Sequence, residues 1–221
     1  HTAVVYDRGF ITIVTGESIT PVARAVDMPI TLEGRALFNV QNALAAAAVG
    51  CALDLKIEQI RQGLVSFFPS PSQTPGRTNF FSVKDFEVML DYAHNPPAYA
   101  NIIDLVARLG HARRLFVFDV VGDRRDEDLT QICRLIASGC QHAIVYEDKS
   151  LRGRAPGELR DLVESDFIEA DFAADAIEKI ADETDAIKKA LSLAEKGDLV
   201  CIMSGRIEQV IQHLESYQQS E

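Results

Sequence analysis

The sequence predicts an α/β protein whose larger, C-terminal part is a doubly wound, mostly parallel sheet. After residue 76, short apolar strand-like runs alternate regularly with amphipathic helical segments, which is the pattern of parallel strands joined by helices. Before residue 68 no such alternation occurs, and a proline-rich segment separates the two parts. Nearly half of the 221 residues are apolar and a quarter are charged, so the chain has the composition of a globular protein with a substantial core.

The first part predicts a few strands followed by two helices. Two alternating runs flank the turn-forming Asp7-Arg8-Gly9 and predict a hairpin, and apolar residues at helical spacing follow later. The expected elements are strands at 2–6, 10–15 and 19–26, then helices at 38–55 and 56–67. Because these elements do not complete a strand–helix alternation, we interpret this part as the end of an interrupted domain.

The boundary falls in residues 68–76, which contain three prolines, a glycine and polar residues. Such a segment cannot sustain helix or ladder hydrogen bonds. We therefore expect one domain remnant over 1–74 and a complete domain over 75–221.

The second part carries the alternation. The expected strands are 80–83, 86–90, 114–121, 143–146, a weak one at 167–169, and 199–203. The expected helices are 96–109, 126–138, 156–164, 174–181, 186–194 and 207–214. Right-handed crossovers between such strands cover both faces of a sheet with helices.

Composition disfavours several classes of function. The formal charge of −11 lies almost entirely after residue 76 and disfavours binding to nucleic acid or an anionic membrane. The longest uncharged apolar run, 43–53, is too short to span a bilayer. No signal peptide is recognisable, and four cysteines without CxxC spacing favour free thiols and a reducing cytoplasm.

Polar residues cluster where four predicted strands end. The loops are Asp91–Pro97, Gly122–Asp126, Glu147–Arg154 and Ser204–Arg206. Carboxyl ends of parallel strands share one edge of a sheet, where ligands bind, so four such loops predict a site. Each loop alone has a simpler explanation as a helix cap or a solvated turn. Asp119, inside its strand, is interpreted as structural.

The usual self-contained catalytic motifs are absent from the sequence. It contains no GxGxxG after a strand, no GxxxxGK[ST], no GxSxG and no HExxH. Dinucleotide-binding, hydrolase and zinc-protease functions are therefore disfavoured for this chain.

Several segments resemble the Mur ligase family. Pro75-Gly76-Arg77 followed by Asp91-Tyr92-Ala93-His94-Asn95-Pro96 resembles the opening of that family's C-terminal domain. Residues 39–46 resemble an asparagine- and alanine-rich helix near the end of its central ATPase domain, although Phe38 stands where many relatives carry histidine. Within the family, the loops at 122–126 and 147–154 are most similar to cyanophycin synthetases.

This resemblance implies ATP-dependent amide-bond formation through an acyl phosphate, with Mg²⁺ and cations stabilising the phosphoryl oxygens. The cyanophycin branch implies addition of L-arginine to the aspartate side chains of an acidic peptide polymer. Because the family's phosphate loop is missing here, we expect this chain to be inactive without upstream residues. Another Mur-type ligase, acting on muramyl peptides or folates, and a non-catalytic binding module are the alternatives; a homo-oligomer is left open.

The resemblance also implies roles for nucleotide-binding residues. Asn39 and Asn42, three apart on one helix face, are expected at the adenine. Arg77 and Asp91 are expected at the ribose, and His94 with Asn95 close to the nucleotide. The simpler alternatives are helix capping for the asparagines and a surface ion pair for Arg77.

The remaining candidates concern the acyl phosphate and the incoming amino acid. At least one of Arg124 and Arg125 is expected to assist the phosphate, with Asp123 holding it in place. His94 is a further catalytic candidate. Glu147 or Asp148 is expected to receive the guanidinium of arginine, and Arg152 or Arg154 its carboxylate, with Ser204 completing the wall. The alternative is that these loop charges pair with one another and staple the loop.

Overall fold

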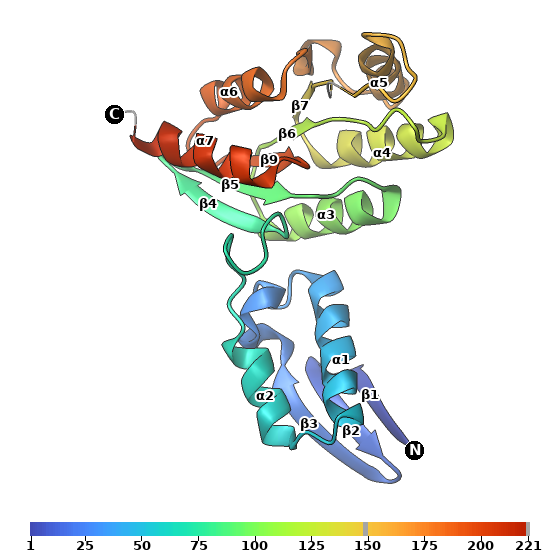
Figure 1. Ribbon diagram of the computed structural model, residues 1–221, viewed down its shortest axis with the longest axis vertical. Coiled ribbons are helices and arrows are strands. Elements are labelled where there is room, and N and C mark those ends of the chain that lie inside the picture. Colours follow the sequence, from blue (N-terminus) through green and yellow to red (C-terminus); the bar gives the residue numbers. More distant parts are fainter. Residues whose placement is uncertain (148–149, 220–221) are drawn as a thin grey trace. The chain divides into compact units, whose positions relative to one another are not determined.

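The computed structural model describes residues 1–147 and 150–219, which form two compact units, His1–Pro69 and Ser70–Glu221 (Figure 1). The division lies within the proline-rich segment. Each unit has its own hydrophobic core. We describe each unit by itself.

The first unit is a three-stranded antiparallel sheet packed against two helices. Its strands are β1 (Thr2–Asp7), β2 (Phe10–Thr15) and β3 (Ser18–Arg24), in that order across the sheet, and its helices are α1 (Leu37–Ala52) and α2 (Ile57–Ser66). The predicted hairpin and both predicted helices are confirmed. Ile11 and Ile13 of the sheet pack with Val40 and Ala47 of α1 and Ile60 of α2.

The second unit is built on a six-stranded sheet. The strand order is β4-β5-β9-β6-β7-β8. β4 pairs antiparallel with β5, and all the other neighbouring strands pair parallel. The strands are β4 (Asn79–Val83), β5 (Phe86–Asp91), β6 (Arg114–Phe118), β7 (His142–Val145), β8 (Ile177–Lys179) and β9 (Leu199–Met203). The predicted mostly parallel α/β fold is confirmed.

Helices cover both faces of this sheet (Figure 1). The helices are α3 (Pro96–Leu109), α4 (Asp126–Gly139), α5 (Glu158–Glu169), α6 (Glu183–Leu193) and α7 (Ile207–Gln219). The connections through α3, α4 and α5 advance across the sheet, whereas the one through α6 returns, so right-handed crossovers place α6 on the opposite face. There Ile187 of α6 and Leu214 of α7 pack against Val117 and Val200 of the sheet. The return inserts β9 between β5 and β6.

Two predicted elements are wrong. Residues 167–169 are not a strand but the end of α5, where Phe167 is fully buried and stacks on Phe118 with ring centroids 5.9 Å apart. Residues 174–181 are not a helix but a short 3₁₀ turn followed by β8. β8 is three residues long, too short to show a period of two, and its conformation is imposed by parallel pairing with β7.

The described residues include no helix that is both long and apolar enough to cross a bilayer. The four cysteines are free thiols, and Cys133, Cys140 and Cys201 are buried in the second unit. Burial raises the pKa of the Cys140 thiol to about 12, so this cysteine behaves as a small apolar side chain.

Candidate functional site

The carboxyl ends of β5, β6, β7 and β9 surround a polar cavity of about 220 Å³ in the second unit. Three of the predicted site residues, His94, Arg152 and Ser204, line it. The lining residues are Tyr92, Ala93, His94, Asp119, Val121, Tyr146, Arg152, Glu183, Met203, Ser204, Gly205 and Arg206. Because β9 lies between β5 and β6, this cavity occupies the crevice where the sheet's connections reverse direction, the usual ligand position in such folds.

A buried carboxylate organises one wall of the cavity. Glu183, in the first turn of α6, is only 6% exposed. Its Oε1 accepts a hydrogen bond from the Ser204 hydroxyl at 2.5 Å and lies 3.0 Å from the Tyr146 hydroxyl. Its Oε2 is 3.2 Å from Nη1 of Arg206. The carboxylate is therefore paired and hydrogen-bonded, as a buried charge must be.

Asp91, predicted at the ribose, is fixed by Thr78, the residue directly before β4. Its Oδ2 accepts hydrogen bonds from the backbone N–H of Thr78 at 2.8 Å and from the Thr78 hydroxyl at 3.0 Å. Burial raises the pKa of Asp91, while these hydrogen bonds and the charge of Arg77 oppose the rise. The carboxylate is mostly buried, and Thr78 holds its orientation at the end of β5.

Tyr92, next to Asp91, contacts both Arg77 and His94. The Arg77 guanidinium lies 5.5 Å from the centroid of the Tyr92 ring, a cation–π arrangement, and the His94 ring centroid is 4.9 Å from that of Tyr92. His94 Nδ1 is 3.0 Å from the Tyr92 carbonyl oxygen. These contacts orient the imidazole, and His94 lines the cavity.

Asn95 caps α3. Its Oδ1 accepts a hydrogen bond from the backbone N–H of Ala98 at 3.0 Å, and Pro96 opens the helix. The capping interpretation is confirmed, and the proximity of Asn95 to a nucleotide stays a prediction.

Asn39 and Asn42 belong to α1 of the first unit and bind each other. The Asn42 amide donates to Asn39 Oδ1 at 3.0 Å, and the Asn39 amide donates to the Ile30 carbonyl at 2.8 Å. Asn42 also borders an apolar cavity of about 420 Å³ between α1 and α2. The predicted ribose residues, Arg77 and Asp91, belong to the second unit. The role of Asn39 and Asn42 at the adenine stays a prediction.

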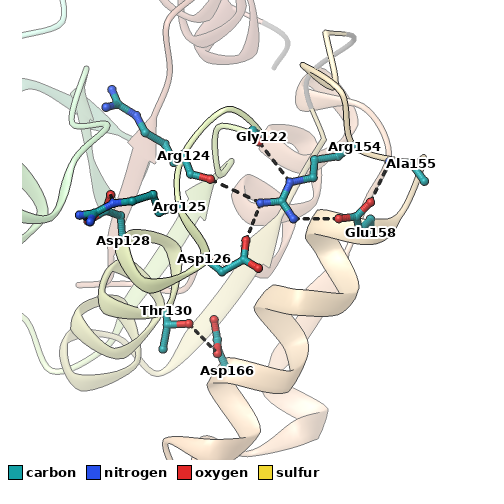
Figure 2. A network of polar contacts seen from close by, with 10 residues as sticks. All are labelled: Gly122, Arg124, Arg125, Asp126, Asp128, Thr130, Arg154, Ala155, Glu158 and Asp166. Atoms are coloured by element: carbon teal, nitrogen blue, oxygen red, sulfur yellow. Dashed lines mark hydrogen bonds and ion pairs between the residues drawn. The ribbon is translucent and has the colours of Figure 1, made fainter.

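Arg154, a predicted carboxylate clamp, connects two loops at the sheet edge (Figure 2). Its Nε donates to the Gly122 carbonyl at 3.1 Å, and its Nη2 donates to the Arg124 carbonyl at 3.4 Å. Its guanidinium also pairs with Asp126 at 2.5 Å and with Glu158 at 2.8 Å. Arg154 therefore holds loops together, as the alternative expected, but not by pairing with Glu147 of its own loop: its partners among the described residues lie after β6 and at the start of α5.

The other loop charges also have partners within the second unit. Arg152 pairs with Asp123 at 2.9 Å, and this hydrogen bond lowers the pKa of Asp123. Glu147 accepts from the backbone N–H of Gly157 at 2.9 Å and lies 3.5 Å from Arg160, beside the start of α5. The predicted role of Asp148 falls outside the described residues.

Arg124, predicted at the acyl phosphate, is exposed to solvent. Its carbonyl oxygen faces Arg154, whereas its guanidinium extends away from the Arg154 network (Figure 2). Neighbouring Arg125 is held by Asp128 at 3.0 Å. Both side chains are exposed and outside the Arg154 network, but Arg125 is paired with Asp128, whereas Arg124 extends from the loop toward solvent.

Sequence reasoning missed Glu183 and Tyr146 and judged Asp119 structural, yet all three line the cavity. Asp119 follows β6 directly, so its place after a buried strand was a usable signal. Glu183 reaches the cavity from the start of α6, and its contact with Tyr146 spans 37 positions of the sequence. No local pattern marks such a contact.

Across residues 1–147 and 150–219, no three carboxylate, imidazole or thiol groups come together as a set able to hold a metal ion.

Comparison with known proteins identifies the family. Residues 76–206, more than half of the chain, match the domain described as Mur ligase, glutamate ligase domain. The chain belongs to the Mur ligase family. This confirms the resemblance on which the predicted roles depend.

The most informative relatives of this Mur ligase chain are cyanophycin synthetases. That of Geminocystis herdmanii is 38% identical over 97% of this chain. The UDP-N-acetylmuramoyl-L-alanyl-D-glutamate--2,6-diaminopimelate ligase of Alkaliphilus metalliredigens is 30% identical over 86% of the chain. The chain spans only about a quarter of the length of the cyanophycin synthetases it matches.

Solved structures share the fold. E. coli FolC, solved in complex with ADP, superposes with a TM-score of 0.70 at 17% identity, covering 99% of this chain and 47% of FolC. The murein peptide ligase Mpl of Psychrobacter arcticus gives a TM-score of 0.63 at 21% identity, covering 98% of this chain and 43% of Mpl. At these identities the likeness concerns the fold alone.

Proposed function

We propose that this chain is the C-terminal part of an ATP-dependent amide ligase of the cyanophycin synthetase type. In the complete protein, ATP phosphorylates an aspartate side chain of an acidic peptide polymer, and the amine of L-arginine displaces phosphate to form the amide. The 38% identity with a cyanophycin synthetase over almost the whole chain supports this assignment. The observation that carries it is the mixed-charge cavity at the carboxyl edge of the sheet.

The cavity has the chemistry that an amino acid requires. It is lined by the cationic Arg152 and Arg206 and by the acidic Asp119 and Glu183. An amino acid carries a carboxylate and an amine on one carbon, so opposite charges within one small cavity complement it. We assign the incoming amino acid to this cavity, with Ser204 in its wall.

The nucleotide is assigned to the residues that the family motif supplies. Asn39 and Asn42 are proposed at the adenine, and Arg77 and Asp91 at the ribose, with His94 and Asn95 nearby. The restraint of Asp91 by Thr78 supports a binding role, because an oriented carboxylate accepts ribose hydroxyls without reordering. Residues 1–74 are then the end of the central ATPase domain, and residues 75–221 the closing domain.

Arg124 is proposed to assist the acyl phosphate, because it extends from the loop that Arg154 holds. A guanidinium suits the charge that develops on phosphoryl oxygens. In the hybrid enzyme described below, Arg124→Ala should lower kcat about a hundredfold, which is the scale of losing one such electrostatic contact. The KM for ATP should change little. Arg125→Ala, whose guanidinium pairs with Asp128, is the matched control and should retain kcat within about twofold.

A hybrid enzyme tests the function. The segment of the Geminocystis herdmanii cyanophycin synthetase that aligns with this chain is replaced by residues 1–221, and phosphate release is measured with ATP, Mg²⁺ and a poly-aspartate primer. We expect release that depends on L-arginine. Release that depends instead on diaminopimelate, for which a 30% identical relative is named, would assign the chain to that ligase class. A folded hybrid that releases no phosphate with either amino acid would support a non-catalytic module.

A further inference from the structure

Glu183 differs from the other acidic residues of this unit in its combination of burial and connectivity. It is 6% exposed, it is the first residue of α6, and it contacts three residues from two different strand ends. Tyr146 follows β7, whereas Ser204 and Arg206 follow β9. A buried carboxylate is costly unless all of its contacts are satisfied, so its position dictates where its partners lie.

Two separate contacts connect Glu183 to Arg206. The direct one is the ion pair between Oε2 of Glu183 and Nη1 of Arg206 at 3.2 Å. The indirect one passes through Ser204, whose hydroxyl donates to Glu183 at 2.5 Å and accepts from the backbone N–H of Arg206 at 2.9 Å. Both the backbone and the side chain of Arg206 are therefore held by the same carboxylate.

Arg206 reaches the cavity from this anchored position. Its side chain is 31% exposed, and the residue lines the cavity together with Ser204. A planar guanidinium presents donors along more than one edge, so one edge can pair with Glu183 while the group contacts a ligand carboxylate. Holding an arginine in one rotamer before the ligand arrives removes the entropy cost of ordering it during binding.

We propose that Glu183 is a positioning residue that holds Arg206 in place to bind the carboxylate of the incoming amino acid. This inference rests on the proposed function, because it assumes that the cavity receives an amino acid. Glu183 itself does not touch the substrate. It acts through Arg206 and Ser204, in the way that outer residues orient the groups that contact a ligand.

The test uses the 221-residue chain and two probes that differ in one group. L-Arginine carries the carboxylate, and agmatine is the same molecule without it. Dissociation constants are measured by NMR titration, following the backbone amides of residues 203–206 and the Nε–H signal of Arg206. For the wild-type chain we expect L-arginine to bind at least tenfold more tightly than agmatine.

Glu183→Gln keeps the size of the side chain but removes the charge that pairs with Arg206. We expect it to weaken L-arginine binding about tenfold, to change agmatine binding less than twofold, and to shift and broaden the Arg206 Nε–H signal. Glu178→Gln is the matched control, since it makes the same change at a carboxylate that pairs with His142 and Lys189 and does not line the cavity. It should keep the preference for L-arginine. Arg206→Gln, at a more exposed position, should abolish the preference even if Glu183→Gln fails to fold.

The outcomes separate this inference from the proposed function. If the wild-type chain prefers L-arginine and folded Glu183→Gln retains that preference, the positioning role of Glu183 is refuted while the cavity assignment stands. If Arg206→Gln retains the preference, the carboxylate contact is refuted. If the wild-type chain binds both probes equally or binds neither, the assignment of an amino acid to this cavity is wrong, and the role of Glu183 is overturned with it.

Discussion

Gly122 lies where two loops of the second unit approach each other closely. A Cβ atom at this position would stand 2.4 Å from the backbone oxygen of Leu151 and 3.0 Å from Cγ of Arg154. The carbonyl of Gly122 itself accepts a hydrogen bond from Arg154. Gly122→Ala therefore forces apart a backbone oxygen and the stem of the residue that connects the loops.

The expected cost follows from these contacts. Adding a methyl group to a tightly packed site costs about 1–3 kcal/mol, and a backbone atom cannot relieve the overlap by rotating away. We expect Gly122→Ala to lower the free energy of unfolding by about 2 kcal/mol. For a unit of roughly 150 residues, this corresponds to a fall in Tm of about 4–8 °C, measurable by scanning calorimetry. Amide exchange in residues 121–126 and 150–154 should accelerate at the same time.

Gly205→Ala provides the matched control for this prediction. It makes the same chemical change on another loop of the same sheet edge, but its Cβ would meet only ring carbons of Tyr92, at 3.3 and 4.0 Å. Tyr92 is 41% exposed and can move, so we expect a change below about 0.5 kcal/mol. An unaltered Tm for Gly122→Ala, or equal losses for the two variants, would refute the argument that the approach to Leu151 constrains this loop.

Three further predictions concern side chains whose environment the structure defines. Burial raises the pKa of Asp91, so the protonated Asp91 side chain stabilises the fold below the ordinary carboxyl pKa, and this stabilisation is lost as pH rises. Asp91→Asn keeps an acceptor for Thr78 and does not titrate. Its free energy of unfolding in urea should therefore rise relative to that of the wild-type chain between pH 3 and 7. A constant difference across that range would contradict this. Asn95→Ala removes the cap of α3 and should cost about 1 kcal/mol, whereas Asn95→Asp should cost less in the same assay. Under native conditions at pH 8, iodoacetamide should label half-buried Cys51 well before Cys140, and similar labelling rates would refute the burial argument.

The sequence predicted helices and strands correctly where cap residues or a continuous apolar run marked their bounds. Helix α3 begins at the predicted residue because Asn95 caps it and Pro96 opens it, and it ends where Gly110 adopts a left-handed conformation. Strand β9 is fully buried and reads as one apolar run. The errors at 167–169 and 174–181 arise where tertiary contacts override local preference. At 167–169, Phe167 is buried against Phe118 as part of a helix. At 174–181, pairing with β7, not the sequence period, defines β8.

The sequence could predict where the candidate site lies, but not which of its charged residues pair with one another. That four polar loops meet at one sheet edge follows from strand–helix alternation alone. Which charges pair there does not follow, because Arg154 meets Asp126 across 28 positions and Glu183 meets Ser204 across 21. Sequence spacing made the charges of 147–154 look complementary to each other, whereas Arg154 and Arg152 in fact pair with the loop after β6 and with α5.

These pairings divide the sheet edge into two parts whose charged groups are arranged differently. The Arg154 guanidinium donates to two backbone carbonyls and pairs with two carboxylates. This part is therefore suited to holding loops and presenting Arg124, not to receiving a ligand. Around Glu183, a buried carboxylate is matched by Arg206, and the matched pair adjoins a cavity. Ligand recognition requires polar groups that are both oriented and accessible. The second part meets both conditions, and a loss of amino-acid selectivity is therefore expected from changes at Glu183 and Arg206, whereas changes at Arg154 and Gly122 should first affect loop stability.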